Sequence, residues 1–105
     1  MSSIDNGADE EDDALDEPLD PQTAQRLIRE ILSGGVFTFS KHCEVEMAAD
    51  NLKTPDCVNV LRAGVVEQPE FDRGTWRYRV RTPRIVVVAA FRSSKELVVV
   101  TAWRI

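Results

Sequence analysis

The apolar residues of this chain change their spacing near Val65, and this single change limits the folds that the chain can adopt. Before Val65 the apolar residues recur at helical spacing, and after it they alternate or form continuous runs, as they do in strands. The strand-like runs are joined by short loops, which suit antiparallel pairing. The sequence therefore predicts an α+β domain in which about three short helices pack on one face of a curved sheet of about four antiparallel strands.

Three helices are predicted, over residues 20–34, 40–51 and 54–64. The first and the third open with a polar capping residue followed by proline, as Asp20-Pro21 and Thr54-Pro55. Glycines end both of these helices, and a serine can cap the helix between them. These local signals agree with one another, so the first two thirds of the chain are expected to be mainly helical.

The last third of the chain is predicted to form strands. Val65–Phe71 contains a proline and is expected at a sheet edge, and Thr75–Thr82 alternates between two kinds of side chain. Ile85–Phe91 is continuously apolar, as in a central strand, and Leu97–Trp103 follows after a short turn. Val36–Phe39, between the first two helices, is short and extended in character.

Charge divides the chain into two segments. Met1–Asp20 holds nine acidic residues and no Lys or Arg, whereas the other 85 residues hold nine acidic and thirteen basic ones. The net charge of −5 therefore combines −9 in the first segment with +4 in the rest. A segment so acidic and so poor in apolar residues cannot offset its ordering entropy by burial. We expect residues 1–19 to be a disordered acidic tail and residues 20–105 to form a single domain.

The chain shows no secretion or membrane signal. Its N-terminus is acidic and lacks an apolar stretch, and no run approaches the roughly 18 apolar residues of a membrane span. Cys43 and Cys57 have no CxxC spacing and are expected to be reduced and buried. These observations predict a cytoplasmic protein without a membrane partner.

An arginine stripe is the strongest local signal for a binding site. Arg77, Arg79 and Arg81 stand at every second position of one predicted strand, so their side chains share a face at intervals of roughly 6.6 Å. Guanidinium groups bind phosphate oxygens in bidentate fashion. Arg84 and Arg92 flank the next strand and could widen the patch. The alternative is a solvated sheet face whose charges have no ligand.

His42 is the only histidine of the chain. On the second predicted helix it shares a polar stripe with Glu46 and Asp50, at i, i+4 and i+8. It could act as a general acid or base or bind a phosphate, and the alternative is a capping or surface histidine. One histidine without a cysteine pair does not supply the ligands of a zinc site, so no metal and no cofactor are expected.

The aromatic residues Trp76 and Tyr78 lie on the strand face opposite the arginines. Packing in the core is one role open to them, and stacking on nucleic-acid bases is the other. Tyr78 differs from Trp76 because its hydroxyl needs a partner and could reach the edge of a site.

Four segments together resemble small bacterial toxins of the RelE/MqsR-like group. Phe39–Met47 resembles the helix that opens these proteins, with Phe-Ser, His and Met at matching spacing. Val60–Glu67 is similar to their helix-to-strand junction, and Trp76–Val80 and Val99–Arg104 complete the pattern. The resemblance covers residues 36–105.

The resemblance implies a compact ribonuclease fold that cuts mRNA without a metal ion, on or off the ribosome. In that chemistry the ribose 2′-hydroxyl attacks the adjacent phosphate. It also implies a cognate antitoxin, which is a zinc-ribbon protein for MqsR-like toxins. The residues that it places in the catalytic site are His42, Tyr78 and Arg79, and the arginines expected to bind the RNA are Arg77, Arg81, Arg84 and Arg92.

Two other functions remain open from the sequence. The domain could be a non-enzymatic module whose basic sheet binds nucleic acid or an acidic partner, or a folded domain whose charges serve solubility alone. The acidic tail could occupy the arginine stripe and compete with RNA, or it could only increase solubility.

Overall fold

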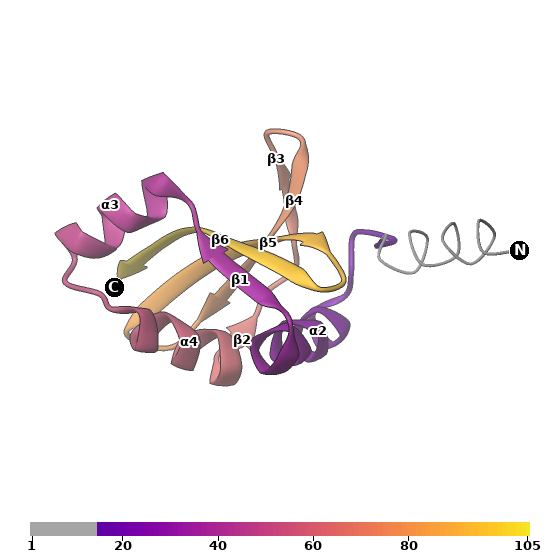
Figure 1. The fold of residues 1–105 in the computed structure, drawn as a ribbon, viewed down its shortest axis with the longest axis horizontal. Coiled ribbons are helices and arrows are strands. Elements are labelled where there is room, and N and C mark those ends of the chain that lie inside the picture. Colours follow the sequence, from indigo (N-terminus) through magenta and orange to yellow (C-terminus); the bar gives the residue numbers. More distant parts are fainter. Residues whose placement is uncertain (1–14) are drawn as a thin grey trace, which may run out of the picture.

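The computed structural model describes residues 15–105 and forms one layer of helices against one sheet (Figure 1). Residues 1–14, most of the predicted acidic tail, lie outside the described residues. Three helices and six strands follow one another along the chain: α2 (Pro21–Gly34), β1 (Val36–Phe39), α3 (Lys41–Ala49), α4 (Thr54–Ala63), β2 (Val65–Val66), β3 (Glu70–Asp72), β4 (Thr75–Arg81), β5 (Ile85–Ser93) and β6 (Glu96–Arg104). The predicted α+β class and the three helices are confirmed.

The sheet has six strands rather than about four, and it is not entirely antiparallel. Its strand order is β1-β6-β5-β4-β2, with β3 paired to β4. The segment Val36–Phe39 is a full edge strand and runs parallel to β6. The predicted strand Val65–Phe71 is divided into β2 and β3, because Pro69 between them has no N–H to continue the ladder. The prediction of a four-stranded meander was therefore wrong in number and in one pairing.

Two of the three helices begin at their predicted capping residues, whereas α4 has its N-cap at Lys53, one residue before the predicted Thr54. The Asp20 side chain accepts a hydrogen bond from the Thr23 N–H at 2.9 Å, and the Ser40 hydroxyl accepts one from the Cys43 N–H at 3.0 Å. Hydrogen bonding also holds the Asp20 pKa below its ordinary value. Within residues 15–105 no helix has the length and apolar character needed to cross a membrane.

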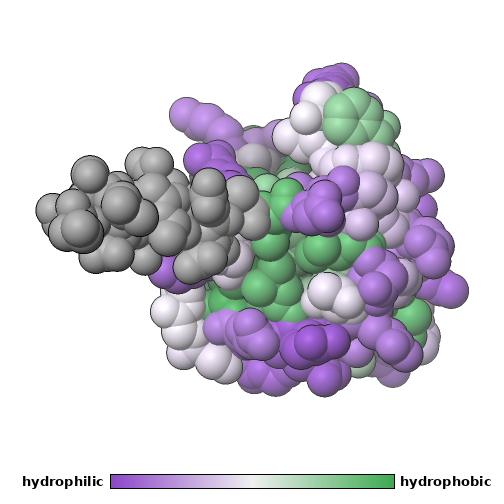
Figure 2. All heavy atoms as spheres, turned by 90° about the vertical axis from the view of Figure 1, so that its right-hand side faces the viewer, coloured by the Kyte–Doolittle hydropathy of each residue, from purple (hydrophilic) through white to green (hydrophobic). Residues whose placement is uncertain are grey.

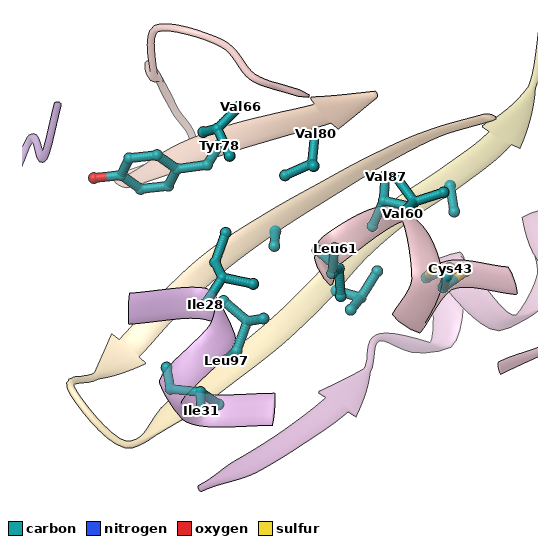
Figure 3. Packing of buried hydrophobic residues seen from close by; sticks show 14 of the residues in the cluster. Ile28, Ile31, Cys43, Val60, Leu61, Val66, Tyr78, Val80, Val87 and Leu97 are labelled. Carbon is teal, nitrogen blue, oxygen red and sulfur yellow. The ribbon is translucent and has the colours of Figure 1, made fainter. Parts of the chain in front are cut away.

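One hydrophobic core joins the three helices to a single face of the sheet. The strands contribute alternate residues, such as Val80 and Val87, and the helices contribute Ile28, Leu61 and other side chains that are shielded from solvent (Figure 3). Cys43 and Cys57 are buried as expected. Burial raises the pKa of Cys43 to about 12 and also raises that of Cys57, so both thiols stay protonated at neutral pH.

No helix among residues 15–105 covers the other face of the sheet. The intervening residues of β5, among them Val86 and Val88, lie on this open face and are covered only by neighbouring side chains. The β3–β4 hairpin extends beyond the edge of the sheet (Figure 1), and its turn places Arg73 and Gly74 at positive φ. The open face and the hairpin are therefore accessible to a ligand.

Residues before Asp20 also pack against the domain. Leu15 and Leu19 pack against the core, whereas the sequence placed both in a disordered tail. The Leu19 N–H donates a hydrogen bond to the Tyr78 hydroxyl, which holds this segment against the domain. Figure 2 shows apolar surface gathered at this end of the molecule, inside a rim of hydrophilic residues.

Candidate functional site

The arginine stripe lies on the open face of the sheet. Along β4, Tyr78 and Val80 are fully buried in the core, whereas Arg77, Arg79 and Arg81 point to the opposite side. This alternation confirms that the three guanidinium groups share a face.

Glu67 bridges two of these arginines. Its Oε2 contacts Arg81 Nε, and its Oε1 lies 3.9 Å from Arg79 Nη1. The backbone fixes this placement, because the Glu67 N–H donates a hydrogen bond to the Arg79 carbonyl at 2.9 Å. Glu67 thus continues the β2–β4 ladder directly opposite Arg79.

The hairpin supplies two further carboxylates. Glu70 Oε1 lies 3.8 Å from Arg79 Nη2, and Asp72 Oδ2 lies 3.6 Å from Arg77 Nη1. Each arginine of the stripe therefore faces an acid from the neighbouring strand. Repulsion among the three like charges is relieved locally, without the acidic tail that the sequence offered as one candidate partner.

A hollow of about 660 Å³ opens over the stripe. Its walls come from β6 on one side and from the segment containing β3 on the other, with β4 and β5 between them. Aromatic side chains stand in both walls, and polar groups lie between them. The lining residues are Glu67, Gln68, Glu70, Phe71, Asp72, Arg77, Arg79, Val88, Thr101 and Trp103.

Phe71 and Trp103 bring different surfaces to the hollow. Phe71 is 61% exposed near the tip of the hairpin, where its ring meets Trp76 edge to face at 5.2 Å between centroids. Trp103 is half-buried and pairs with Val86 on the neighbouring strand. Trp103 shares the open face with Val86, whereas the Phe71 ring packs on Trp76, which lies on the strand face opposite the arginines.

Sequence reasoning missed the carboxylates and Phe71, and it did not place Trp103 at the site. A signal for the carboxylates was present, because the turn at Asp72-Arg73-Gly74-Thr75 fixes a hairpin in which Glu70 stands opposite Arg77. The same register carried further back would place Glu67 opposite Val80, but β2 pairs with β4 one residue out of this register, so Glu67 lies opposite Arg79 and its position has no such local signal. Trp103 reaches the hollow only through the pairing of β5 with β6, and that pairing has no equally local signal.

Tyr78 does not join Arg79 at the site. Neighbouring residues of a strand point to opposite faces, and Tyr78 is completely buried on the helix-covered side, with its ring 5.1 Å from that of Phe91. Its hydroxyl points away from Val80 (Figure 3) and donates to Glu17 Oε2 at 2.9 Å. The same hydroxyl accepts a hydrogen bond from the Leu19 N–H at 2.9 Å. Mainly through burial, the pKa of Tyr78 rises to about 12.

His42 lies on α3 and outside the hollow. Its side chain is 67% exposed, and Nε2 lies 3.2 Å from Glu46 Oε1, which confirms the predicted i, i+4 pair. Asp50 does not extend this pair, because its carboxylate accepts a hydrogen bond from the Arg104 N–H. Within residues 15–105 no three His, Cys, Asp or Glu side chains gather in a way that could hold a metal ion.

Arg84 and Arg92 do not widen the stripe into the hollow, because neither belongs to its lining. Arg92 pairs with Glu96 at 4.0 Å beside the β5–β6 turn. Arg84 lies in the loop before β5, where its carbonyl accepts a hydrogen bond from the Ile105 N–H. Of the seven predicted site residues, only Arg77 and Arg79 line the hollow, and Arg81 adjoins it through Glu67.

The fold and the hollow define a small α+β domain with a charge-paired, aromatic-lined site on an open sheet face. Residues 39–104 match the model of a protein family described as a domain of unknown function, DUF4258. The chain belongs to this family. The match contains every lining residue of the hollow, whereas α2 precedes it. No curated protein and no solved structure matches the chain.

Proposed function

We propose that this protein binds RNA in the hollow and cleaves it without a metal ion, as a RelE/MqsR-like endoribonuclease. The observation that carries the proposal is the combination of Arg77 and Arg79 with Phe71 and Trp103 around one cavity. An RNA strand offers phosphates and planar bases at regular spacing, which suits arginines placed between aromatic walls.

The carboxylates around the stripe do not prevent phosphate from binding. The Arg79 pairs with Glu67 and Glu70 span 3.8–3.9 Å, and the side chains are between 34% and 76% exposed. Exposed pairs of this kind contribute about 0–1 kcal/mol each. A bidentate phosphate is a stronger partner for a guanidinium group, so it can displace them.

The cleavage part of the proposal is supported by the resemblance to RelE/MqsR-like toxins and by the arginines. The reaction builds up negative charge on the phosphate, and fixed guanidinium groups nearby would stabilise it. Tyr78 and His42, the proton-transfer groups that the resemblance suggested, do not line the hollow. This observation favours a second candidate function, in which the hollow binds nucleic acid without cutting it.

The test compares Arg79→Ala with Arg92→Ala. Both variants remove one paired surface arginine, but only the first lies in the hollow. We expect Arg79→Ala to weaken binding of a single-stranded RNA about 10-fold or more, as charge-assisted hydrogen bonds of about 1.5–3 kcal/mol imply. Cleavage, assayed in a chelating buffer with and without ribosomes, should be lost in the same variant, and Arg92→Ala should behave like the parent.

The outcomes separate the two candidates. RNA cleavage that survives in the chelator and depends on Arg79 supports the endoribonuclease. If RNA binds in a salt-sensitive way but no cleavage product forms at any ribosome concentration, the protein is a nucleic-acid-binding module and not an enzyme. RNA that fails to bind the parent protein at low salt refutes both.

A toxin–antitoxin context is part of the proposal and rests on the resemblance alone. It predicts that expression of the protein arrests bacterial growth and that a protein encoded by the adjacent gene relieves the arrest. An Arg79→Ala variant, produced at the same level, should leave growth unchanged.

A further inference from the structure

We propose that Glu67 is the general base of the reaction, the group that takes the proton from the attacking ribose 2′-hydroxyl. The assignment rests on the proposed endoribonuclease function and names a residue for a task that neither His42 nor Tyr78 can reach in this fold. It follows from the position of Glu67, from its free acceptor capacity and from its neighbours.

The position of Glu67 is fixed by the sheet. Its N–H donates to the Arg79 carbonyl at 2.9 Å, so its side chain leaves the backbone beside that of Arg79 on the open face. Oε2 is held by Arg81 Nε. Glu67 directly follows β2 and is hydrogen-bonded to β4, and a base so placed and oriented by a neighbouring charge keeps one geometry, which proton transfer requires.

The second carboxylate oxygen remains available. Oε1 lies 3.9 Å from Arg79 Nη1, which is beyond hydrogen-bond distance. A carboxylate oxygen can accept more than one hydrogen bond, so Oε1 can accept one from a ligand hydroxyl while Oε2 stays with Arg81. A phosphate bound by Arg79 would lie next to this oxygen, and the 2′-hydroxyl is the hydroxyl adjacent to that phosphate.

The other carboxylates of the hollow are less suited to this task. The side chains of Glu70 and Asp72 are 76% and 59% exposed and belong to the projecting hairpin, whereas that of Glu67 is 34% exposed and lies on the sheet. Water therefore competes more strongly with a ligand hydroxyl for hydrogen bonds to the carboxylates of Glu70 and Asp72. Among the described residues that line the hollow, Glu67 is therefore the best-enclosed proton acceptor.

The step is balanced without a cofactor. The 2′-hydroxyl proton passes to Glu67 Oε1, and the oxygen lone pair forms a bond to phosphorus. The bond from phosphorus to the 5′-oxygen breaks, and its electron pair stays on that oxygen, which takes a proton from water. The products are a 2′,3′-cyclic phosphate and a 5′-hydroxyl end, and Glu67 then releases its proton to water.

The test compares Glu67→Gln with Glu96→Gln in the full chain. Glutamine keeps the shape of the side chain and an oxygen that accepts from arginine, but it does not take up a proton. We expect Glu67→Gln to lower kcat for cleavage of a single-stranded RNA by about 10²–10⁴-fold, the usual contribution of general base catalysis. Glu96→Gln also removes the carboxylate partner of a surface arginine, Arg92, but lies outside the hollow and should change kcat by less than about threefold.

Binding is measured separately, with an oligonucleotide that lacks the 2′-hydroxyl at the cleavage position and cannot be cut. Equal affinities of the parent protein and Glu67→Gln would show that the arginines remain in place. The assignment is overturned if Glu67→Gln keeps cleavage within about threefold of the parent, or if its loss of cleavage equals its loss of binding. The first result leaves the endoribonuclease intact with another base, whereas a parent that binds RNA without any cleavage overturns the proposed function as well.

Discussion

Replacement of Tyr78 by Phe separates a structural role of this side chain from a catalytic one. The hydroxyl makes two hydrogen bonds, to Glu17 Oε2 and from the Leu19 N–H, both at 2.9 Å. Phenylalanine keeps the ring and its contact with Phe91 but leaves the Leu19 N–H without this partner. A lost hydrogen bond and an unsatisfied donor cost roughly 1–3 kcal/mol together.

We therefore expect Tyr78→Phe to lower the free energy of unfolding by about 1–3 kcal/mol, or to lower Tm by about 4–8 °C for each kcal/mol in a domain of this size. The measurement is denaturant unfolding followed by tryptophan fluorescence. A double-mutant cycle with Glu17→Ala should give a coupling energy that accounts for part of this loss. RNA cleavage, measured well below the melting temperature, should stay within about threefold of the parent.

The pH dependence of stability gives an independent check. The folded chain holds the Tyr78 proton up to a pH of about 12, whereas the ordinary tyrosine pKa is 10.0. Between these values only the unfolded chain has lost the proton, so stability falls as pH rises, by about 1.4 kcal/mol for each pH unit. Tyr78→Phe should remove this part of the alkaline loss, and the part that comes from Cys43 should remain.

A structural role for Tyr78 is refuted if Tyr78→Phe abolishes cleavage while its unfolding curve matches that of the parent protein. That result would place the hydroxyl in the catalytic site, as the sequence resemblance suggested. A variant with unchanged stability and unchanged cleavage would show instead that the two hydrogen bonds contribute nothing net.

Three further changes test other parts of the structure. Gly64→Ala should destabilise the fold by about 1–3 kcal/mol in denaturant unfolding, because the added Cβ would lie 2.7 Å from the Val60 carbonyl oxygen and 2.9 Å from that of Arg81. Arg73→Gly should raise Tm, since φ of 52° is unfavourable for arginine by roughly 1 kcal/mol, and a lower Tm would contradict this. Deletion of residues 1–14, which hold six acids and no base, should tighten RNA binding several-fold at low salt and little at high salt, and equal affinities at low salt would dismiss competition by the tail.

The helices could be predicted because their signals are local. The caps at Asp20 and Ser40 and the proline at the first turn lie within a few residues of the helix that each begins. The strand count could not be predicted in the same way. The segment Val36–Phe39 forms a strand because it pairs with residues sixty positions later in the chain. A segment of four residues is too short for its sequence pattern to indicate so distant a partner.

The same distinction explains the site. The common face of Arg77, Arg79 and Arg81 follows from the two-residue period of one strand, and it was predicted correctly. The partners of Tyr78 lie about sixty residues earlier, in a segment whose composition is typical of disorder, so its role as an anchor for Leu19 could not be seen. Glu70 and Asp72 were within reach of prediction, because hairpin register is also a local property, whereas Glu67 depends on the separate pairing of β2 with β4.

The carboxylates change the electrostatic character of the arginine stripe. Three arginines in sequence predict a positive surface, yet Glu67, Glu70 and Asp72 make the site a network of paired charges. A phosphate that binds there exchanges partners with an acid, so each arginine contributes less affinity than it would on a bare surface. Contacts with the aromatic walls then add to the affinity that the arginines provide. Because of this exchange, each carboxylate that loses its arginine partner lies next to the bound ligand, where it can accept a proton from a ligand hydroxyl.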